Sequence, residues 1–195
     1  MSLQGDYFDR MYAGAEDPWG FATRWYEQRK YALTLAALPA PVYSSALEIG
    51  CSIGILTGAL AARCSSLVAL DPSAAALRSA ATRVPPWVRL VEGRAPDDWP
   101  DGPYDLVVLS EVAYYLDAVD LERLLDRVEG DLRPGGTVVA CHWRHPVADY
   151  PLTGDQVHAA LERWPRVSRV EEEDFLLDVL VPGGSQSVAR REGLV

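Results

Sequence analysis

From residue 45 onward the sequence alternates short apolar runs with helical segments of roughly ten residues. This alternation is typical of βαβ units, in which strands pair in parallel and helices cover both faces of the sheet. It predicts an α/β protein with a doubly wound, mostly parallel seven-stranded sheet. We expect strands near 45–49, 66–70, 88–91, 105–109, 136–141, 167–172 and 175–181, and helices near 54–63, 73–83, 119–132 and 153–164.

The first 40 residues differ from this pattern, because they contain two helical segments and no strand-like run. We expect helices at 3–13 and 23–38 that form a cover over a core at 41–182, with a polar tail at 183–195. A chain of 195 residues suffices for one domain of this size but not for two. The aromatic side chains of the cover either pack in the core or close over a site, and we favour closure: Tyr7, Tyr12, Trp19, Trp25 and Tyr26.

Composition excludes several classes of partner. The formal net charge of −10 opposes binding to a nucleic-acid backbone or an anionic membrane, since both interactions depend on Lys and Arg. The three cysteines lack CxxC spacing, so we expect neither a disulfide framework nor a bound metal. The sequence shows neither a signal-peptide pattern nor a spanning run of about 18 apolar residues, which predicts a cytoplasmic protein.

A nucleotide-type site is indicated where the first two strands end. The segment LEIGCSIG at 47–54 runs from a strand into a turn with Gly50, Ser52 and Gly54, where glycine permits close backbone approach to a ligand. The second strand ends at Asp71, at the distance from Gly50 that suits a ribose-binding carboxylate. These features alone allow either a dinucleotide or an adenosyl sulfonium compound.

The charge beside the turn separates these alternatives. Glu48 lies two residues before Gly50, where it would repel a pyrophosphate but would pair with the ammonium group of a methionine moiety. The spacing also departs from GxGxxG. Both points favour the sulfonium compound over a nicotinamide or flavin dinucleotide.

Together with VRLVEGRAPDDWP, YDLVVLSEV and LRPGGTVVACHWR, these motifs resemble class I S-adenosylmethionine-dependent methyltransferases over about residues 45–145. The resemblance implies a Rossmann-like fold, S-adenosyl-L-methionine as cofactor and S-adenosyl-L-homocysteine as product. Ser52 departs from the glycine that is commoner in the family. The implied cofactor-binding residues are Glu48, Gly50, Cys51, Ser52, Gly54, Asp71, Pro72, Gly93, Arg94, Ala95, Ser110 and Glu111.

The acceptor is expected at the carboxyl ends of the fourth and fifth strands. Glu111 or His142 is positioned by sequence to accept a proton from an amine, and Tyr115 is the third candidate for the catalytic side. The alternatives are a structural hydrogen bond for His142 and core packing for Tyr114 and Tyr115.

Four further segments, DPWGFATRWYEQRKY, SEVAYYL, CHWRHP and LTGDQVH, resemble the nodulation protein S group, N-methyltransferases that act on deacetylated chitooligosaccharides. This resemblance implies that Trp19, Arg24, Arg29 and Lys30 belong to the cofactor and acceptor cover, and that the acceptor is a small molecule with a sugar amine. For Lys30 we favour a solvated charge on an amphipathic helix. O-methylation of a small metabolite and cofactor binding without turnover remain alternatives.

Overall fold

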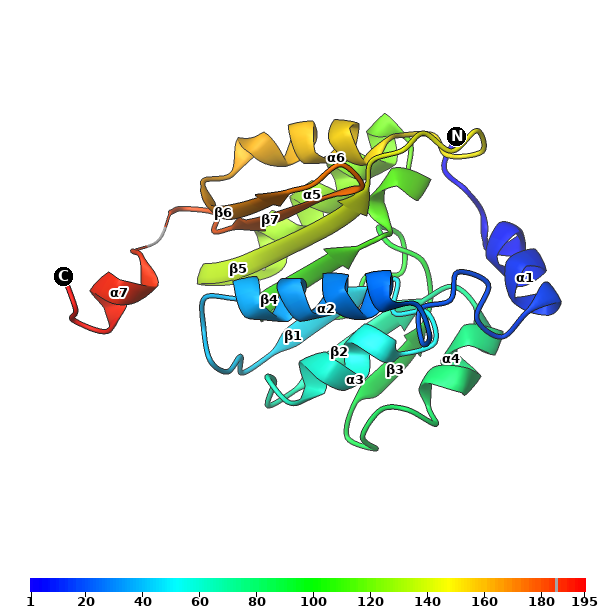
Figure 1. Cartoon of the computed structure of the whole chain (residues 1–195), viewed down its shortest axis with the longest axis horizontal. Helices are drawn as coiled ribbons and strands as arrows, with labels where there is room; N and C mark the ends of the chain where they lie inside the picture. The colour runs from blue at the N-terminus through cyan, green and yellow to red at the C-terminus, as the bar shows by residue number, and fades with distance from the viewer. Residues whose placement is uncertain (185) are drawn as a thin grey trace.

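In the computed structural model, which describes residues 1–184 and 186–195, a seven-stranded sheet has the order β3-β2-β1-β4-β5-β7-β6 (Figure 1). Strands β1 to β5 are parallel, and β7 runs antiparallel to both β5 and β6. The predicted doubly wound sheet is confirmed. The strands are β1 Ala46–Ile49, β2 Leu67–Asp71, β3 Arg89–Glu92, β4 Tyr104–Ser110, β5 Leu132–Trp143, β6 Arg166–Glu171 and β7 Phe175–Leu180.

Helices cover both faces of the sheet, and each predicted helix is present within a few residues of its expected bounds (Figure 1). The α-helices are α1 Gly5–Gly14, α2 Trp25–Ala37, α3 Ile55–Ala61, α4 Ala74–Ala80, α5 Ala118–Asp131, α6 Gly154–Ala160 and α7 Val188–Arg191. Short 3-10 turns follow at η1 Ala113–Tyr115 and η2 Leu161–Arg163.

Alternation along the strands divides the core into two layers. On β4, Val107 and Leu109 pack with α5 and α6, whereas Leu106 and Val108 pack with α2 and α3. Because both faces are covered, β1 is buried along its whole length rather than at alternate residues.

Three details differ from the sequence-based expectation. Strand β5 begins at Leu132, so Pro134-Gly135-Gly136 lies inside the strand instead of before it, where the pairing of β5 with β4 shifts in register. The predicted polar tail contains the short helix α7, which Arg191 ties to the carbonyl oxygen of Pro39 at 2.7 Å. In the expected cover, α2 packs beside α3 on the sheet, whereas α1 contacts α4.

Within the described ranges, every helix is too short or too polar to cross a membrane.

Candidate functional site

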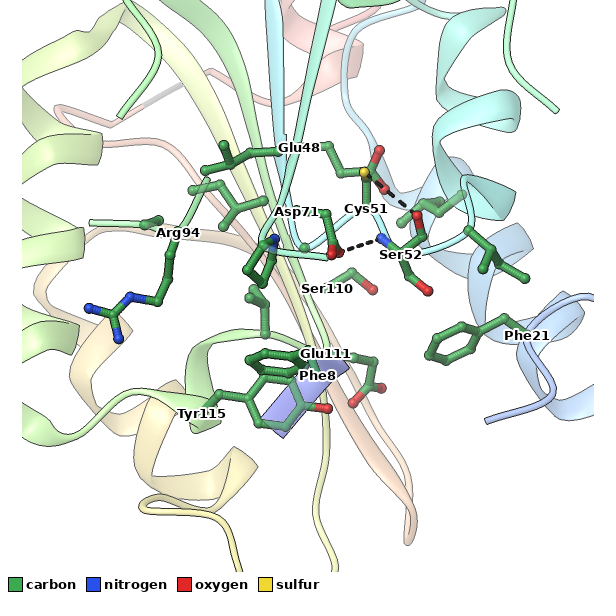
Figure 2. Close-up of a pocket in the computed structure, with 18 of the residues that line it drawn as sticks. Phe8, Phe21, Glu48, Cys51, Ser52, Asp71, Arg94, Ser110, Glu111 and Tyr115 are labelled. Carbon is green, nitrogen blue, oxygen red and sulfur yellow. Dashed lines mark hydrogen bonds between the residues drawn. The ribbon is translucent and has the colours of Figure 1, made fainter. Parts of the chain in front are cut away.

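The carboxyl ends of β1, β2 and β4 border a cavity, here called the turn cavity because the turn after β1 forms part of its wall (Figure 2). In open α/β sheets ligands bind at this edge, where successive crossovers leave in opposite directions. Most residues predicted from sequence to hold the cofactor meet there: Trp19, Glu48, Gly50, Cys51, Ser52, Asp71, Pro72, Gly93, Arg94, Ala95, Ser110 and Glu111. Tyr115 also lines this cavity.

The turn after β1 requires left-handed backbone at three positions. Gly50, Ser52 and Gly54 have φ of 77°, 50° and 81°. Ser52 thus adopts the conformation that glycine would take at the position where this sequence departs from the family. An added Cβ at Gly50 would lie 2.9 Å from Val112, and one at Gly54 would lie 2.9 Å from Ala80. Both glycines thus also prevent clashes with protein side chains, and Gly50 lines the turn cavity whereas Gly54 does not.

Asp71 fastens the turn to the end of β2. Its carboxylate accepts hydrogen bonds from the backbone N–H of Ser52 at 2.8 Å and of Ser73 at 2.9 Å. Burial nevertheless raises the pKa of Asp71 to about 6, because these two bonds offset only part of the cost of desolvation. The side chain is 5% exposed, at the cavity wall where a hydroxyl-bearing ligand can donate to it.

Glu48 is the most isolated carboxyl group in the wall of the turn cavity. It is 2% exposed, and its Oε2 has no hydrogen-bond partner in the described part of the chain. Burial, with a smaller contribution from Asp71, raises the pKa of Glu48 to about 8. A buried carboxyl without a partner is costly, and a cationic ligand would remove that cost.

Aromatic side chains from the N-terminal segment cover the turn. The hydroxyls of Tyr12 and Ser52 are 2.5 Å apart, and Tyr12 packs edge-to-face on Trp19 at 5.6 Å. Phe8 contacts Tyr115 in the same way at 5.0 Å (Figure 2). Residues before α2 therefore close one side of the turn cavity.

The loop after β3 forms the opposite end. The backbone N–H of Gly93 donates to the carbonyl oxygen of Asp71 at 3.1 Å, which holds the loop beside β2. The guanidinium of Arg94 points away from the cavity toward Asp97, at 2.8 Å (Figure 2). Arg94 thus contributes its backbone and its aliphatic stem rather than its charge to the wall.

A further cavity, here called the aromatic cavity, adjoins the turn cavity. Trp19, Phe21, Glu111 and Tyr115 line both cavities and form the neck between them. The remaining lining residues are Pro18, Arg24, Tyr26, Glu27, Lys30, Tyr114, Trp143, Val147, Tyr150 and Asp174.

Glu111 anchors the neck. It follows β4 with a φ of 55°, a left-handed conformation that is strained for glutamate. Its carboxylate accepts hydrogen bonds from Lys30 Nζ at 2.6 Å, Tyr114 Oη at 2.5 Å and the backbone N–H of Trp143 at 3.0 Å. The position fits the prediction, and three donors of the protein already bind this carboxylate.

Lys30 is not the solvated charge that we expected. It is 2% exposed and lies 2.6 Å from Glu111 Oε1 and 2.9 Å from Glu27 Oε2. The expectation fails because α2 turns this side chain toward the ends of β4 and β5, where two carboxylates compensate its desolvation.

His142 is not in the wall of either cavity. It is fully buried under α6; its Nε2 accepts from the backbone N–H of Ala113 at 3.2 Å, and its Nδ1 lies 3.2 Å from His158 Nε2. The accepting Nε2 places the proton of neutral His142 on Nδ1, and burial lowers its pKa well below the ordinary range. This geometry removes His142 from the candidate proton acceptors and supports the structural alternative.

The chain of hydrogen bonds continues across the sheet. His158 Nδ1 lies 2.7 Å from Asp178 Oδ2, and Asp178 also accepts from Arg169 at 2.6 and 2.8 Å. Arg166 lies 2.9 Å from the same carboxylate. These contacts fix η1, and hence Tyr114 and Tyr115, against the sheet.

Arg29 does not contribute to either cavity. It is 43% exposed and forms a bidentate pair with Glu172 at 2.6 and 2.9 Å. The predicted role of Arg29 toward the cofactor therefore has no support in this geometry, because its guanidinium pairs with Glu172 outside both cavities.

Sequence reasoning missed Glu27 and Tyr150, whereas Tyr12 was expected among the aromatic side chains of the cover. Glu27 precedes Lys30 by three residues, a spacing that places both side chains on one helix face and offers a usable signal. Tyr150 stacks on Tyr114 with ring centroids 4.9 Å apart, a contact between distant segments without a local pattern in the sequence.

Comparisons with known proteins agree with this geometry. The profile described as Nodulation protein S matches residues 6–150. Nodulation protein S of Rhizobium tropici is 30% identical over 130 residues, which cover 64% of this chain and 54% of that protein. That of Sinorhizobium fredii is 27% identical over 162 residues, or 80% of this chain and 68% of that protein. The chain thus spans about half the length of the Rhizobium tropici relative.

Two solved structures match over a larger share of their own length than these relatives do. The N-methyltransferase NodS from Bradyrhizobium japonicum WM9, in complex with S-adenosyl-L-homocysteine, is 25% identical with a TM-score of 0.83, and the match covers 92% of this chain and 98% of that one. A Pseudomonas syringae protein, assigned only provisionally as a methyltransferase, is 45% identical with a TM-score of 0.72, covering 81% and 99%. The architecture is therefore the Rossmann-like fold of S-adenosylmethionine-dependent methyltransferases.

Proposed function

The chain belongs to the nodulation protein S family, and from this premise we propose that it transfers a methyl group from S-adenosyl-L-methionine to a nitrogen of a small polar acceptor. The observation that carries the proposal is the junction of the turn cavity with the aromatic cavity at Glu111. The first offers carboxylates to a cationic adenosyl sulfonium compound, and the second offers room for an acceptor at the same neck.

The residues of the turn cavity fit the cofactor. Glu48, whose buried Oε2 needs a partner, would hold the ammonium of the methionine part, and Asp71 would accept from the ribose hydroxyls. The loop at 93–95 would border the adenine. When bound, the cofactor supplies an electrophilic methyl group, so the protein has mainly to align the acceptor and remove a proton.

The aromatic cavity supports a polar acceptor that carries an amine. Its wall combines aromatic faces, such as Tyr114, Tyr150 and Trp143, with buried carboxylates. Aromatic rings supply apolar surface for a ring-shaped ligand, and carboxylates pair with an ammonium group. An amino sugar or the free amine of a deacetylated chitooligosaccharide meets both requirements.

We assign the segment before α2 as the cover of this single domain. Leu3, Phe8, Tyr12, Trp19 and Phe21 line the turn cavity from residues that precede the sheet in the chain. They would exclude water from the reacting groups, which strengthens the electrostatic contacts inside.

A labelled-methyl transfer screen tests the proposal. Purified protein is incubated with labelled S-adenosyl-L-methionine and, separately, with amino sugars, deacetylated chitooligosaccharides, small amines and the matching hydroxyl compounds. We expect label in amines and not in the hydroxyl compounds. Label in the hydroxyl compounds alone would contradict N-methylation, and cofactor binding without transfer to any compound would contradict an enzyme.

A further inference from the structure

Glu27 is the second buried carboxylate of the aromatic cavity, and it accepts fewer hydrogen bonds than Glu111. It lies in the first turn of α2, lines the aromatic cavity and is 7% exposed. Its Oε2 has no hydrogen-bond partner within the described ranges, although Lys30 Nζ is only 2.9 Å away. The ammonium of Lys30 instead directs its hydrogen bond to Glu111 at 2.6 Å. Lys30 thus lies within ion-pair distance of both carboxylates, and its shorter contact is with Glu111.

Around Glu27, the wall of the aromatic cavity contains more carboxylates than cations. The carboxylates that line the cavity are those of Glu27, Glu111 and Asp174, and the cations are those of Lys30 and Arg24. Asp174 is 45% exposed and contacts His145, and Arg24 is exposed, so the charges shielded from solvent are two carboxylates against Lys30. The other titratable groups in the wall are the phenols of Tyr26, Tyr114, Tyr115 and Tyr150. An ammonium group on the acceptor would balance the buried charge and give Glu27 a second cationic partner beside Lys30.

Burial raises the proton affinity of the Glu27 carboxylate. Desolvation raises its pKa above the ordinary range, and this effect exceeds the opposing effect of Lys30. A carboxylate with a raised pKa takes a proton from an amine more readily than an ordinary one, because the two proton affinities are closer.

On the basis of the N-methyl transfer proposed above, we propose that Glu27 binds the acceptor as an ammonium ion and takes its proton, while Lys30 is the positioning residue that holds Glu27 and Glu111 in register. The proton passes from nitrogen to Glu27 Oε2, which becomes a neutral acid. The nitrogen lone pair then forms the bond to the methyl carbon, and the carbon–sulfur bond breaks with its electron pair going to sulfur. The product is a secondary ammonium ion and a neutral thioether.

The first test compares Glu27→Gln with the wild-type protein. The variant keeps the shape of the side chain, and Lys30 keeps its bond to Glu111. We expect methyl transfer to a primary amine to fall about 100-fold or more, with affinity for S-adenosyl-L-homocysteine within about twofold of wild type. Glu172→Gln is the matched control, because it removes a carboxylate that contacts α2 outside both cavities, and its transfer rate should be unchanged.

A second readout uses binding without turnover. In the complex with S-adenosyl-L-homocysteine, the wild-type protein should bind glucosamine more tightly than glucose by about tenfold, since only the former carries the ammonium. Glu27→Gln should lose this preference. An aminooxy analogue, whose nitrogen is neutral at pH 7, should react with the variant at a rate close to that of wild type.

The possible results distinguish a protein in which Glu27 has no such role from one that does not N-methylate amines at all. If wild-type protein methylates amines and Glu27→Gln keeps both its rate and its preference for glucosamine, Glu27 has no such role. An equal loss of rate with the amine and the aminooxy acceptor would show a structural role and would also overturn the proton transfer. If wild-type protein methylates no amine while binding the cofactor, the proposed function itself fails.

Discussion

Buried carboxylates have different partners in the two halves of the sheet. Beside β1 and β2, Glu48 and Asp71 form no ion pair with any side chain in the described part of the protein, and burial raises both pKa values. Beside β5 and β7, Asp178 is bonded to Arg166, Arg169 and His158. Hydrogen bonds from Arg169 keep the pKa of Asp178 below its ordinary range, despite its burial.

This difference indicates that the β1–β2 side binds the ligand, whereas the β5–β7 side holds neighbouring elements in place. Carboxylates without a cation store a cost that a positively charged ligand can remove, so the β1–β2 side is prepared for the cofactor. Carboxylates that are already paired fix the positions of neighbouring elements, and the β5–β7 side thereby holds η1 and its tyrosines at the neck. Four substitutions or conditions test this contrast.

The largest expected effect is on the paired side. Asp178→Ala leaves Arg169 and His158 without their acceptor, and we expect a loss of about 3–5 kcal/mol in the free energy of unfolding, measured by urea titration. Asp155→Ala breaks the exposed pair with Arg144 and serves as the control, with an expected loss below about 1 kcal/mol. Equal losses in the two variants would show that the buried network has no special role.

Asp71→Ala tests the ribose contact. We expect binding of S-adenosyl-L-homocysteine to weaken by about 1–3 kcal/mol in calorimetry, because charged hydrogen bonds to the hydroxyls are lost. Asp105→Ala is a matched control: Asp105 also accepts two backbone N–H groups, those of Ser44 and Ser45, but lies outside the turn cavity. Equal loss of affinity in both variants would assign Asp71 to the fold alone.

The pH dependence of stability tests Glu48. Its pKa rises from 4.5 to about 8 on folding, so the folded protein binds a proton that the unfolded chain has released. Between pH 6.5 and 8 the ligand-free protein should therefore lose about 1–2 kcal/mol of stability as pH rises. Below pH 6.5 His142 has the opposite effect on stability. Its pKa is lowered in the folded protein, so the unfolded chain binds more protons there and stability falls as pH falls. Thermal melts of Glu48→Gln should be flat in the upper window, and a slope equal to that of wild type would exclude Glu48 as its source.

The smallest effect is expected at the surface. Arg29→Ala removes an exposed ion pair with Glu172, so stability should change by less than about 1 kcal/mol. Affinity for S-adenosyl-L-homocysteine should be unchanged. A tenfold loss of affinity would restore the cofactor role that the sequence resemblance implies for Arg29.

The sheet and the turn cavity were predictable from sequence because their signals are local. Glu48 lies near the end of β1, Asp71 ends β2 and Glu111 follows β4. Since these strands are parallel, residue order alone brings the three side chains to one edge. The burial of Lys30 was not predictable, since it depends on which face of α2 meets the sheet. The burial of His142 was partly predictable. His142 shares a face of β5 with Val138 and Ala140, which pack toward α6, and this alternation indicates burial.

Calorimetry of S-adenosyl-L-homocysteine binding at pH 7, repeated in buffers of different ionisation enthalpy, tests the central contrast most directly. Glu48 holds a proton in the ligand-free protein and should lose it when the ammonium of the ligand arrives. We predict binding with release of about one proton in the wild type and of far less in Glu48→Gln. Binding without proton exchange in the wild type, or no binding at millimolar ligand, would contradict this account.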